Sequence, residues 1–254
     1  MKNVFVLWKD IIVNPFEGYK GVNESTKILL PLLSIIVLFL ISISMIVPIM
    51  LSDAYGDAVV RVQISTMAER GNEMSAEQQA AVAEQIKSPM VRNITIVSAY
   101  AGGLITFFLV TLLVTLILKI VISSVKKETV NFSLVFKIII FASIVAMIQS
   151  ILKMGITLSG DWERTLSRVN DTAALQQALQ SPVSLAALAD PGAVSNSVYM
   201  LIDSFSDIFN WIYYIFLYAG LRVVTQLEKK PALIIIIALA LFSIAIGLLF
   251  TLFT

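Results

Sequence analysis

The chain has 254 residues, of which 58% are apolar and 14% charged, with a mean hydropathy of +0.89 and a formal net charge of +1. Soluble domains carry about 25% charged residues, so a water-soluble fold of this size could not hide so much apolar surface. The near-zero net charge argues against nucleic acid as a partner, because binding phosphates requires a concentrated basic surface.

Cysteine and histidine are both absent from the sequence. Catalysis by a thiol or an imidazole is therefore excluded, as are disulfides and the nitrogen and sulfur ligands that zinc favours. The sequence also contains no phosphate-binding loop, dinucleotide-binding motif or metal-ligand cluster. We therefore expect a protein that is not an enzyme and that uses no metal and no cofactor.

The N-terminal segment, residues 1–27, is expected to lie in the cytoplasm ahead of the membrane domain. It lacks the character of a signal peptide, because the apolar run that follows it is too long and has no cleavage site. Its apolar residues recur at helical spacing before Pro15: Val4, Leu7, Trp8, Ile11 and Ile12. This spacing predicts a short interfacial helix. A partly disordered tail is the alternative, because so short a helix is marginally stable alone.

Five apolar segments in residues 28–254 are long enough to cross a membrane as helices, which takes about 20 residues each. Their approximate bounds are 28–51, 93–118, 132–158, 198–224 and 232–253. The predicted fold class is therefore an all-α membrane protein, a bundle of five transmembrane helices. The fourth segment is the least apolar, and the fifth carries no ionisable side chain.

Two long hydrophilic connections, residues 52–92 and 159–197, separate the first span from the second and the third from the fourth. Each begins with an acid near an aromatic residue and contains an Ala/Gln-rich stretch that ends in Ser-Pro, at 75–89 and at 170–182. Both connections are predicted to be partly helical. The likeness indicates either a duplicated unit, as in transporters with parallel repeats, or the chance similarity of two Ala/Gln-rich helices.

Basic residues are distributed unevenly on the two sides of the spans. The side of the N-terminus has 11 basic and 5 acidic residues, a net charge of +6, whereas the opposite side has 7 basic and 12 acidic residues, a net charge of −5. Because cytoplasmic loops are enriched in Lys and Arg, this asymmetry predicts a cytoplasmic N-terminus. Five spans then place the C-terminus and both long connections on the extracytoplasmic side.

Four polar residues of the fourth span fall at i, i+3, i+4 and i+7, on one helical stripe: Asp203, Ser206, Asp207 and Asn210. Asp at the centre of a membrane helix costs about 2.5 to 3.5 kcal/mol, so the stripe is expected to face the bundle interior, water or a cation. Gln149 and Lys153 are i, i+4 neighbours on the third span at a similar depth. Together the six residues predict a polar pocket between spans three and four that opens to the outside, with Lys153 as the partner of Asp203 or Asp207.

Two other interpretations of these residues remain. In a structural interpretation, Asp203 lies in the headgroup region and Lys153 extends to the outer interface. In a catalytic interpretation, Asp203 and Asp207 serve an intramembrane hydrolase. The catalytic interpretation is disfavoured, because paired catalytic acids usually come from different elements and need a shaped site.

Small residues are predicted to allow close helix packing. Gly102 and Gly103 lie on the second span, and Gly220 lies on the fourth. Glycines on membrane helices let another helix approach closely, and this role is favoured here over a ligand site.

Two stretches and the five-span layout resemble the Yip1 domain family, in its bacterial branch. The first stretch is NPFEGYKGV, at residues 14–22, and the second is DSFSDIFNWIYYIFLYAGLRVVTQLEKKPA, at residues 203–232. Within the second stretch the likeness lies in an acid before an aromatic residue, a Trp, a Gly and a basic turn with a small residue that enters span five: Asp203, Phe205, Trp211, Gly220 and Ala232.

The resemblance implies a five-span bundle with a cytosolic N-terminus, here in a bacterial cytoplasmic membrane. Eukaryotic members act in endoplasmic reticulum and Golgi trafficking and bind Rab GTPases and one another. Their DLYGP-type cytosolic motif is absent from this chain, so Rab binding is not expected.

We therefore expect a non-enzymatic protein that acts by helix association in membrane organisation or trafficking-like processes. Its expected partners are membrane lipids and either a second copy of itself or other membrane proteins. The alternative is a transporter or lipid translocator that uses the polar pocket between spans three and four.

Overall fold

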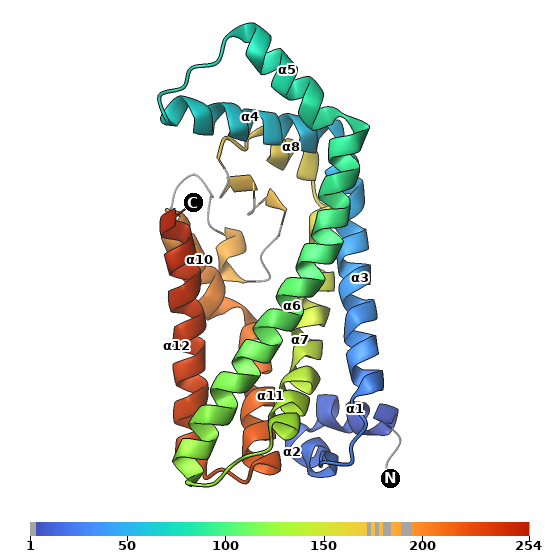
Figure 1. Cartoon of the computed structure of the whole chain (residues 1–254), viewed down its shortest axis with the longest axis vertical. Helices are drawn as coiled ribbons and strands as arrows, with labels where there is room; N and C mark the ends of the chain where they lie inside the picture. The colour runs from blue at the N-terminus through green and yellow to red at the C-terminus, as the bar shows by residue number, and fades with distance from the viewer. Residues whose placement is uncertain (1–3, 172–173, 176–177, 180–183, 189–194, 254) are drawn as a thin grey trace. The chain divides into compact units, whose positions relative to one another are not determined.

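The computed structural model describes residues 4–171, 174–175, 178–179, 184–188 and 195–253, and all regular elements in this part of the chain are helical. Four of the described helices are long and apolar enough to cross a membrane (Figure 1): α3 (Leu29–Leu51), α6 (Pro89–Lys126), α7 (Phe132–Ser159) and α12 (Lys229–Phe253). The predicted all-α fold with apolar helices compatible with a membrane is therefore confirmed.

The fourth predicted span is divided. The sequence predicts one helix over 198–224, and this prediction is wrong, because α10 (Asn196–Ser206) ends and α11 (Ile208–Val224) begins on either side of Asp207. Asp207 has extended backbone angles, φ −73° and ψ 110°, and its side chain accepts a hydrogen bond from the backbone N–H of Phe209. A short polar side chain can satisfy the free N–H groups of a helix start, which favours a new helix at this point.

The predicted polar stripe is divided with the helix. Asp203 and Ser206 lie in the last turn of α10, whereas Asn210 lies in the first turn of α11. With 17 residues, α11 rises about 26 Å, slightly less than the roughly 30 Å of a bilayer's hydrocarbon core.

The chain folds into two compact units, and the first comprises residues 1–39, 104–149 and 207–247. Its core is the first half of α7, where most side chains from Val135 to Val145 are buried. Three short N-terminal elements belong to this unit: α1 (Val4–Val13), α2 (Pro15–Gly18) and η1 (Tyr19–Gly21).

The predicted N-terminal helix is present as α1, and one of its faces is buried in the core of the first unit. Leu7 and Ile11 are almost fully buried, whereas Ile12 and Val13 are exposed. The exposed side chains alone are available to a membrane interface. Tyr19 and Val22 are buried as well, so the N-terminal segment packs on the first unit through these four side chains.

Tyr19 and Gly220 meet at the same point of α7. The Tyr19 side chain is fully buried, and its hydroxyl donates a hydrogen bond of 3.2 Å to the carbonyl oxygen of Ile138. Burial raises the pKa of Tyr19, so the hydroxyl stays protonated and remains a donor. A Cβ atom on Gly220 would overlap Cγ2 of Ile138 and would lie 3.2 Å from Cε1 of Tyr19. A side chain at residue 220 would therefore require Ile138 to shift.

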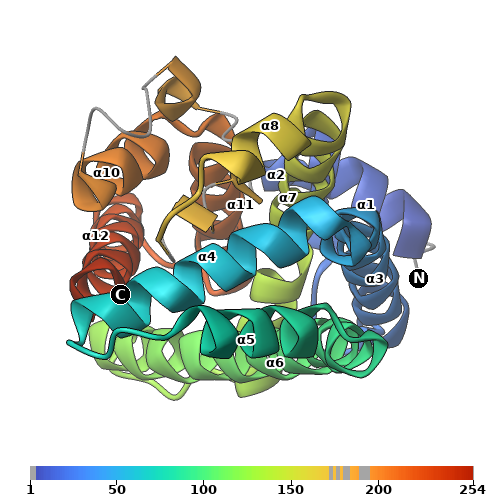
Figure 2. The same cartoon turned by 90° about the horizontal axis from the view of Figure 1, so that it is seen from above.

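The second unit comprises residues 40–103, 150–206 and 248–254 and contains α4 (Asp53–Glu69), α5 (Ala76–Lys87), α8 (Trp162–Ser167) and η2 (Leu185–Leu188). Helices α4 and α5 lie side by side (Figures 1 and 2). A small hydrophobic core joins α4 to α8 and consists of Ile49, Ala58, Val62, Leu166 and Val169.

Helix α5 confirms the helix predicted within residues 75–89. Ser75 and Gln78 form a capping box, in which each side chain accepts a hydrogen bond from the other residue's backbone N–H. The corresponding stretch at 170–182 lies in large part outside the described residues, so the duplication remains an untested prediction.

Arg92 joins three segments of the second unit. Its Nη1 donates to the carbonyl oxygen of Leu51 at 2.7 Å, and its Nη2 lies 2.7 Å from Oδ1 of Asp53. The hydrogen bond from Arg92 lowers the pKa of Asp53, which keeps this exposed carboxylate ionised and paired.

We expect Gly220→Ala to lower the free energy of unfolding by about 1 to 3 kcal/mol, because the added methyl group overlaps Ile138 in a well-packed core. The matched control is Gly155→Ala on α7, where a Cβ would make only an ordinary contact of 3.8 Å with Cε of Met45. This control should be neutral, or stabilising by up to about 1 kcal/mol, because Ala is the better helix former. Unfolding of both variants in the same mild detergent measures the difference, and equal stabilities would contradict the packing described here.

Candidate functional site

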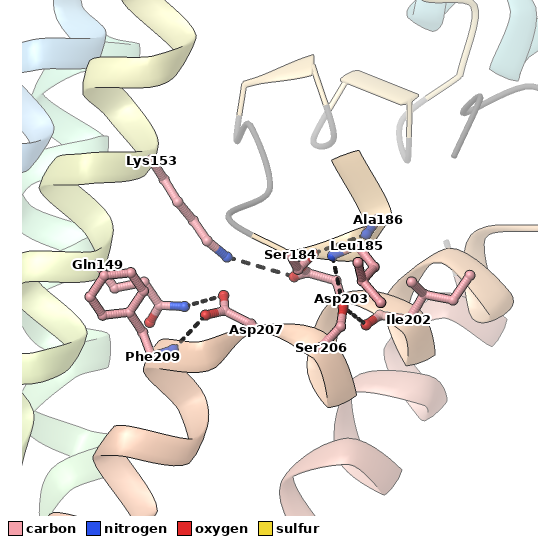
Figure 3. A network of polar contacts seen from close by, with 10 residues as sticks. All are labelled: Gln149, Lys153, Ser184, Leu185, Ala186, Ile202, Asp203, Ser206, Asp207 and Phe209. Carbon is pink, nitrogen blue, oxygen red and sulfur yellow. Dashed lines mark hydrogen bonds and ion pairs between the residues drawn. The ribbon is translucent and has the colours of Figure 1, made fainter. Parts of the chain in front are cut away.

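The six polar residues predicted to form a pocket divide between the two units. Gln149, Asp207 and Asn210 belong to the first unit, and Lys153, Asp203 and Ser206 belong to the second. Figure 3 shows the contacts of Gln149, Lys153, Asp203, Ser206 and Asp207.

In the first unit, Asp207 is a fully buried carboxylate with donors on both of its oxygens. Oδ1 accepts from the backbone N–H of Phe209 at 2.9 Å, and Oδ2 accepts from the Nε2 amide of Gln149 (Figure 3). Removing a carboxylate from water is costly unless hydrogen bonds replace its hydration. The Gln149 amide and the start of α11 together provide that replacement.

Asn210 lies one residue after Phe209, in the first turn of α11. Its backbone N–H donates to the carbonyl oxygen of Asp207 at 3.2 Å. Asp207 thus supports the start of α11 through its backbone as well as its side chain, and it links α11 to α7 through Gln149.

In the second unit, Asp203 is the acid that pairs with Lys153. The Nζ atom of Lys153 lies 3.6 Å from Oδ2 of Asp203, and the two side chains are 15% and 29% exposed. Oδ1 of Asp203 accepts from the hydroxyl of Ser184 at 2.6 Å. The ion pair therefore joins α7 to α10, and Ser184 joins α10 to the segment that precedes η2.

Ser206 provides a second link between α10 and this segment. Its hydroxyl accepts from the backbone N–H of Leu185 at 3.0 Å and donates to the carbonyl oxygen of Ile202 at 2.5 Å (Figure 3). The sequence did not indicate Ser184, because no regular spacing relates a residue in this connection to α10.

Lys137 is a further residue whose role the sequence did not indicate. It lies on α7, is 3% exposed, and donates through Nζ to the carbonyl oxygens of Asn23 and Glu24 at 2.9 and 2.8 Å. The Asn131 side chain donates to Oε1 of Glu24 at 2.9 Å. These contacts hold the segment before α3 against the start of α7. The sequence signal that could have indicated this role is the presence of a lysine within the first six residues of an apolar span.

The three predicted packing glycines have different surroundings. Gly220 is in close contact with Ile138 and Tyr19, as described above. Gly102 is exposed on α6 and has open space where a side chain would stand, and Gly103 beside it is half-buried. Close packing within the chain is therefore observed at Gly220.

The chemistry of these residues is that of helix-to-helix linkage. Among the described residues, no group of three or more His, Cys, Asp or Glu side chains is placed to hold a metal ion. One cavity of about 150 Å³ lies in the first unit near Phe209, and its lining is apolar: Ile12, Ile144, Val145, Ile148, Phe209, Ile212 and Phe216. Such a cavity suits a hydrocarbon group better than a polar ligand.

No family model, curated protein or solved structure matches this chain. The fold defines its class, an all-helical protein with four helices that could cross a membrane among the described residues.

We expect Asp207→Ala to destabilise the protein by about 1 to 3 kcal/mol, because it removes the cap of α11 and leaves the Gln149 amide without its acceptor. Asp207→Asn should cost less than about 1 kcal/mol, since Asn caps helices as well as Asp. Its carbonyl can accept from Phe209, and its amide can donate to a rotated Gln149. Chemical unfolding in one detergent compares the two variants. An Ala variant as stable as the parent would contradict this role for Asp207.

Proposed function

We propose that this chain is a non-enzymatic integral membrane protein of the Yip1 type that acts by helix association in membrane organisation or trafficking-like processes. Its partners are a second copy of the chain or other membrane proteins, together with membrane lipids. Its location is the bacterial cytoplasmic membrane.

The proposal includes five crossings, with α11 as the shortest of them. The N-terminus lies in the cytoplasm, and the C-terminus and the long connections lie outside. Support for this orientation comes from the charge difference of +6 on one side against −5 on the other. The family is proposed from the sequence resemblance of residues 14–22 and 203–232 and from the five-span layout.

The observation that carries the proposed function is an exposed stripe along α6 that has small residues at its centre. Ile94, Ser98, Gly102, Ile105 and Leu109 follow one another at steps of three or four residues, and all five are exposed. Steps of this kind place side chains on one face of a helix. Because a small residue lets a second helix come close, this face suits association in a membrane, where close packing rather than water exclusion drives helix contact.

The polar side chains give complementary support. Asp207, Asp203 and Lys153 bond to side chains of the protein itself, and the cavity beside Phe209 has an apolar lining. Ionisable groups that are paired in this way stabilise helix contacts without requiring a transported substrate.

We expect Gly102→Leu to raise the dissociation constant for self-association about tenfold, the equivalent of about 1.4 kcal/mol, because a Leu side chain keeps the partner helix away. The control is Asn93→Leu, an exposed position nine residues earlier and thus on the opposite face of α6. Native mass spectrometry over a dilution series in mild detergent measures the dimer fraction. A chain that is monomeric at every concentration and carries no co-purifying membrane protein would contradict the proposal.

A second candidate is a transporter or lipid translocator, which the helix break at Asp207 favours. Many transporters build their sites from discontinuous helices in which a helix start lies next to charged groups. In this case Asp207→Asn, which keeps the cap but removes the charge, should reduce lipid or solute movement in liposomes by at least about tenfold. Glu77→Gln, at an exposed position of α5, is the control and should keep full activity. Wild-type protein that moves none of the lipids and solutes offered would contradict this candidate.

A further inference from the structure

A second and larger apolar cavity lies in the first unit between the later part of α6 and the beginning of α12, whose ribbons approach each other there (Figure 1). Its volume is about 740 Å³. Residues from both helices line it, including Ile117, Val121 and Val125 on α6 and Pro231, Ala238 and Phe242 on α12, and every lining residue is apolar. We call this cavity the α6–α12 groove.

The length of the groove matches one leaflet of a bilayer. From Pro231 to Phe242 the α12 helix advances eleven residues, or about 16 Å. The hydrocarbon core of a bilayer is about 30 Å thick, so the groove covers roughly half of it. Pro231 lies in the first turn of α12, which places one end of the groove at the level where the apolar helix begins.

That end of the groove is basic. Lys229 and Lys230 are exposed and directly precede Pro231, and Lys126 and Lys127 directly follow Val125. Lys126 is engaged with Glu128 and with the carbonyl oxygen of Thr225. Two acids, Glu128 and Glu228, are next to the four lysines in sequence, so these six residues carry a net charge of +2.

We propose that the α6–α12 groove binds one acyl chain of an anionic phospholipid, with the lipid phosphate held by Lys229, Lys230 and Lys127. The apolar lining suits the acyl chain of the lipid, and the length of the groove matches the depth of one leaflet. The excess positive charge at the first turn of α12 suits the anionic headgroup. A helix from a second copy of the protein could also fill the groove, but it would not provide the negative charge that these lysines require. The inference rests on the proposed function only in requiring that α6 and α12 cross a membrane.

The test is native mass spectrometry of the full-length protein released from vesicles that contain equal amounts of phosphatidylglycerol and phosphatidylethanolamine. Phosphatidylglycerol should be retained preferentially. Lys229→Gln combined with Lys230→Gln should weaken its binding about 25-fold, because a lysine near an anionic headgroup contributes roughly a factor of five. Ala238→Trp, which fills the groove from an exposed position, should remove both lipids.

Matched controls separate the site from general effects. Lys9→Gln combined with Lys27→Gln removes the same charge from exposed positions elsewhere in the first unit, and Leu241→Trp adds an aromatic ring on α12 outside the groove. Both should bind phosphatidylglycerol as the parent does. Equal retention of the two lipids, or an equal loss of binding in the lysine variant and its control, would overturn the proposal.

A third result would also overturn it, namely loss of a dimer without loss of lipid in Ala238→Trp, which would assign the groove to a second copy. Lipid adducts and dimers differ in mass, so failure of this proposal and failure of helix association are read separately in the same spectra. The Lys229→Gln and Lys230→Gln double variant changes only exposed side chains. Its loss of phosphatidylglycerol binding therefore still tests the proposal if Ala238→Trp does not fold.

Discussion

The contact of Gly220 with Ile138 and Tyr19 is the point on which the first unit depends. The residue without a side chain allows α11 to approach α7 closely, and the Tyr19 hydroxyl bonds to the carbonyl oxygen of Ile138 at the same place. Packing of this kind matters more in a membrane than in water, because the hydrophobic effect does not drive apolar helices together in lipid. Close van der Waals contact and satisfied hydrogen bonds are then the main sources of stability.

Polar residues in the apolar helices follow the same constraint. Asp207 lies at a helix start and against Gln149, Lys137 donates to two backbone carbonyls, and Lys153 lies beside Asp203. Each arrangement places a charged group near atoms of opposite partial or full charge, which offsets part of the cost of removing it from water. These residues therefore stabilise contacts between separate segments of the chain.

Two surfaces of the long apolar helices indicate which partners each could bind. The α6 stripe around Gly102 is mostly apolar with small residues, and the α6–α12 groove has a wholly apolar lining. The stripe has small residues at its centre, as suits another helix, whereas the groove is a cavity with lysines at one end, as suits a lipid. The two surfaces therefore suit partners of different kinds.

The sequence by itself determined the all-helical class and the positions of four long apolar helices, because an uninterrupted apolar run of about 20 residues or more has few other stable structures. It also indicated the helices α1 and α5, whose signals are local in the chain. Among the site residues, it singled out Asp203, Asp207, Gln149 and Lys153 from their rarity in apolar surroundings.

Only the tertiary structure decided how these residues are used. The spacing of residues predicted a continuous helix through residue 207, but a new helix begins directly after Asp207. The Asp207 carboxylate caps this helix by accepting a hydrogen bond from Phe209, and it accepts another from Gln149. The sequence left open whether Lys153 pairs with Asp203 or Asp207, and the structure pairs it with Asp203. The hydrogen bonds of Ser184 to Asp203 and of Lys137 to the carbonyl oxygen of Asn23 join further residues that are not neighbours in sequence. Such contacts depend on how helices pack in three dimensions, and no local pattern in the chain records that packing.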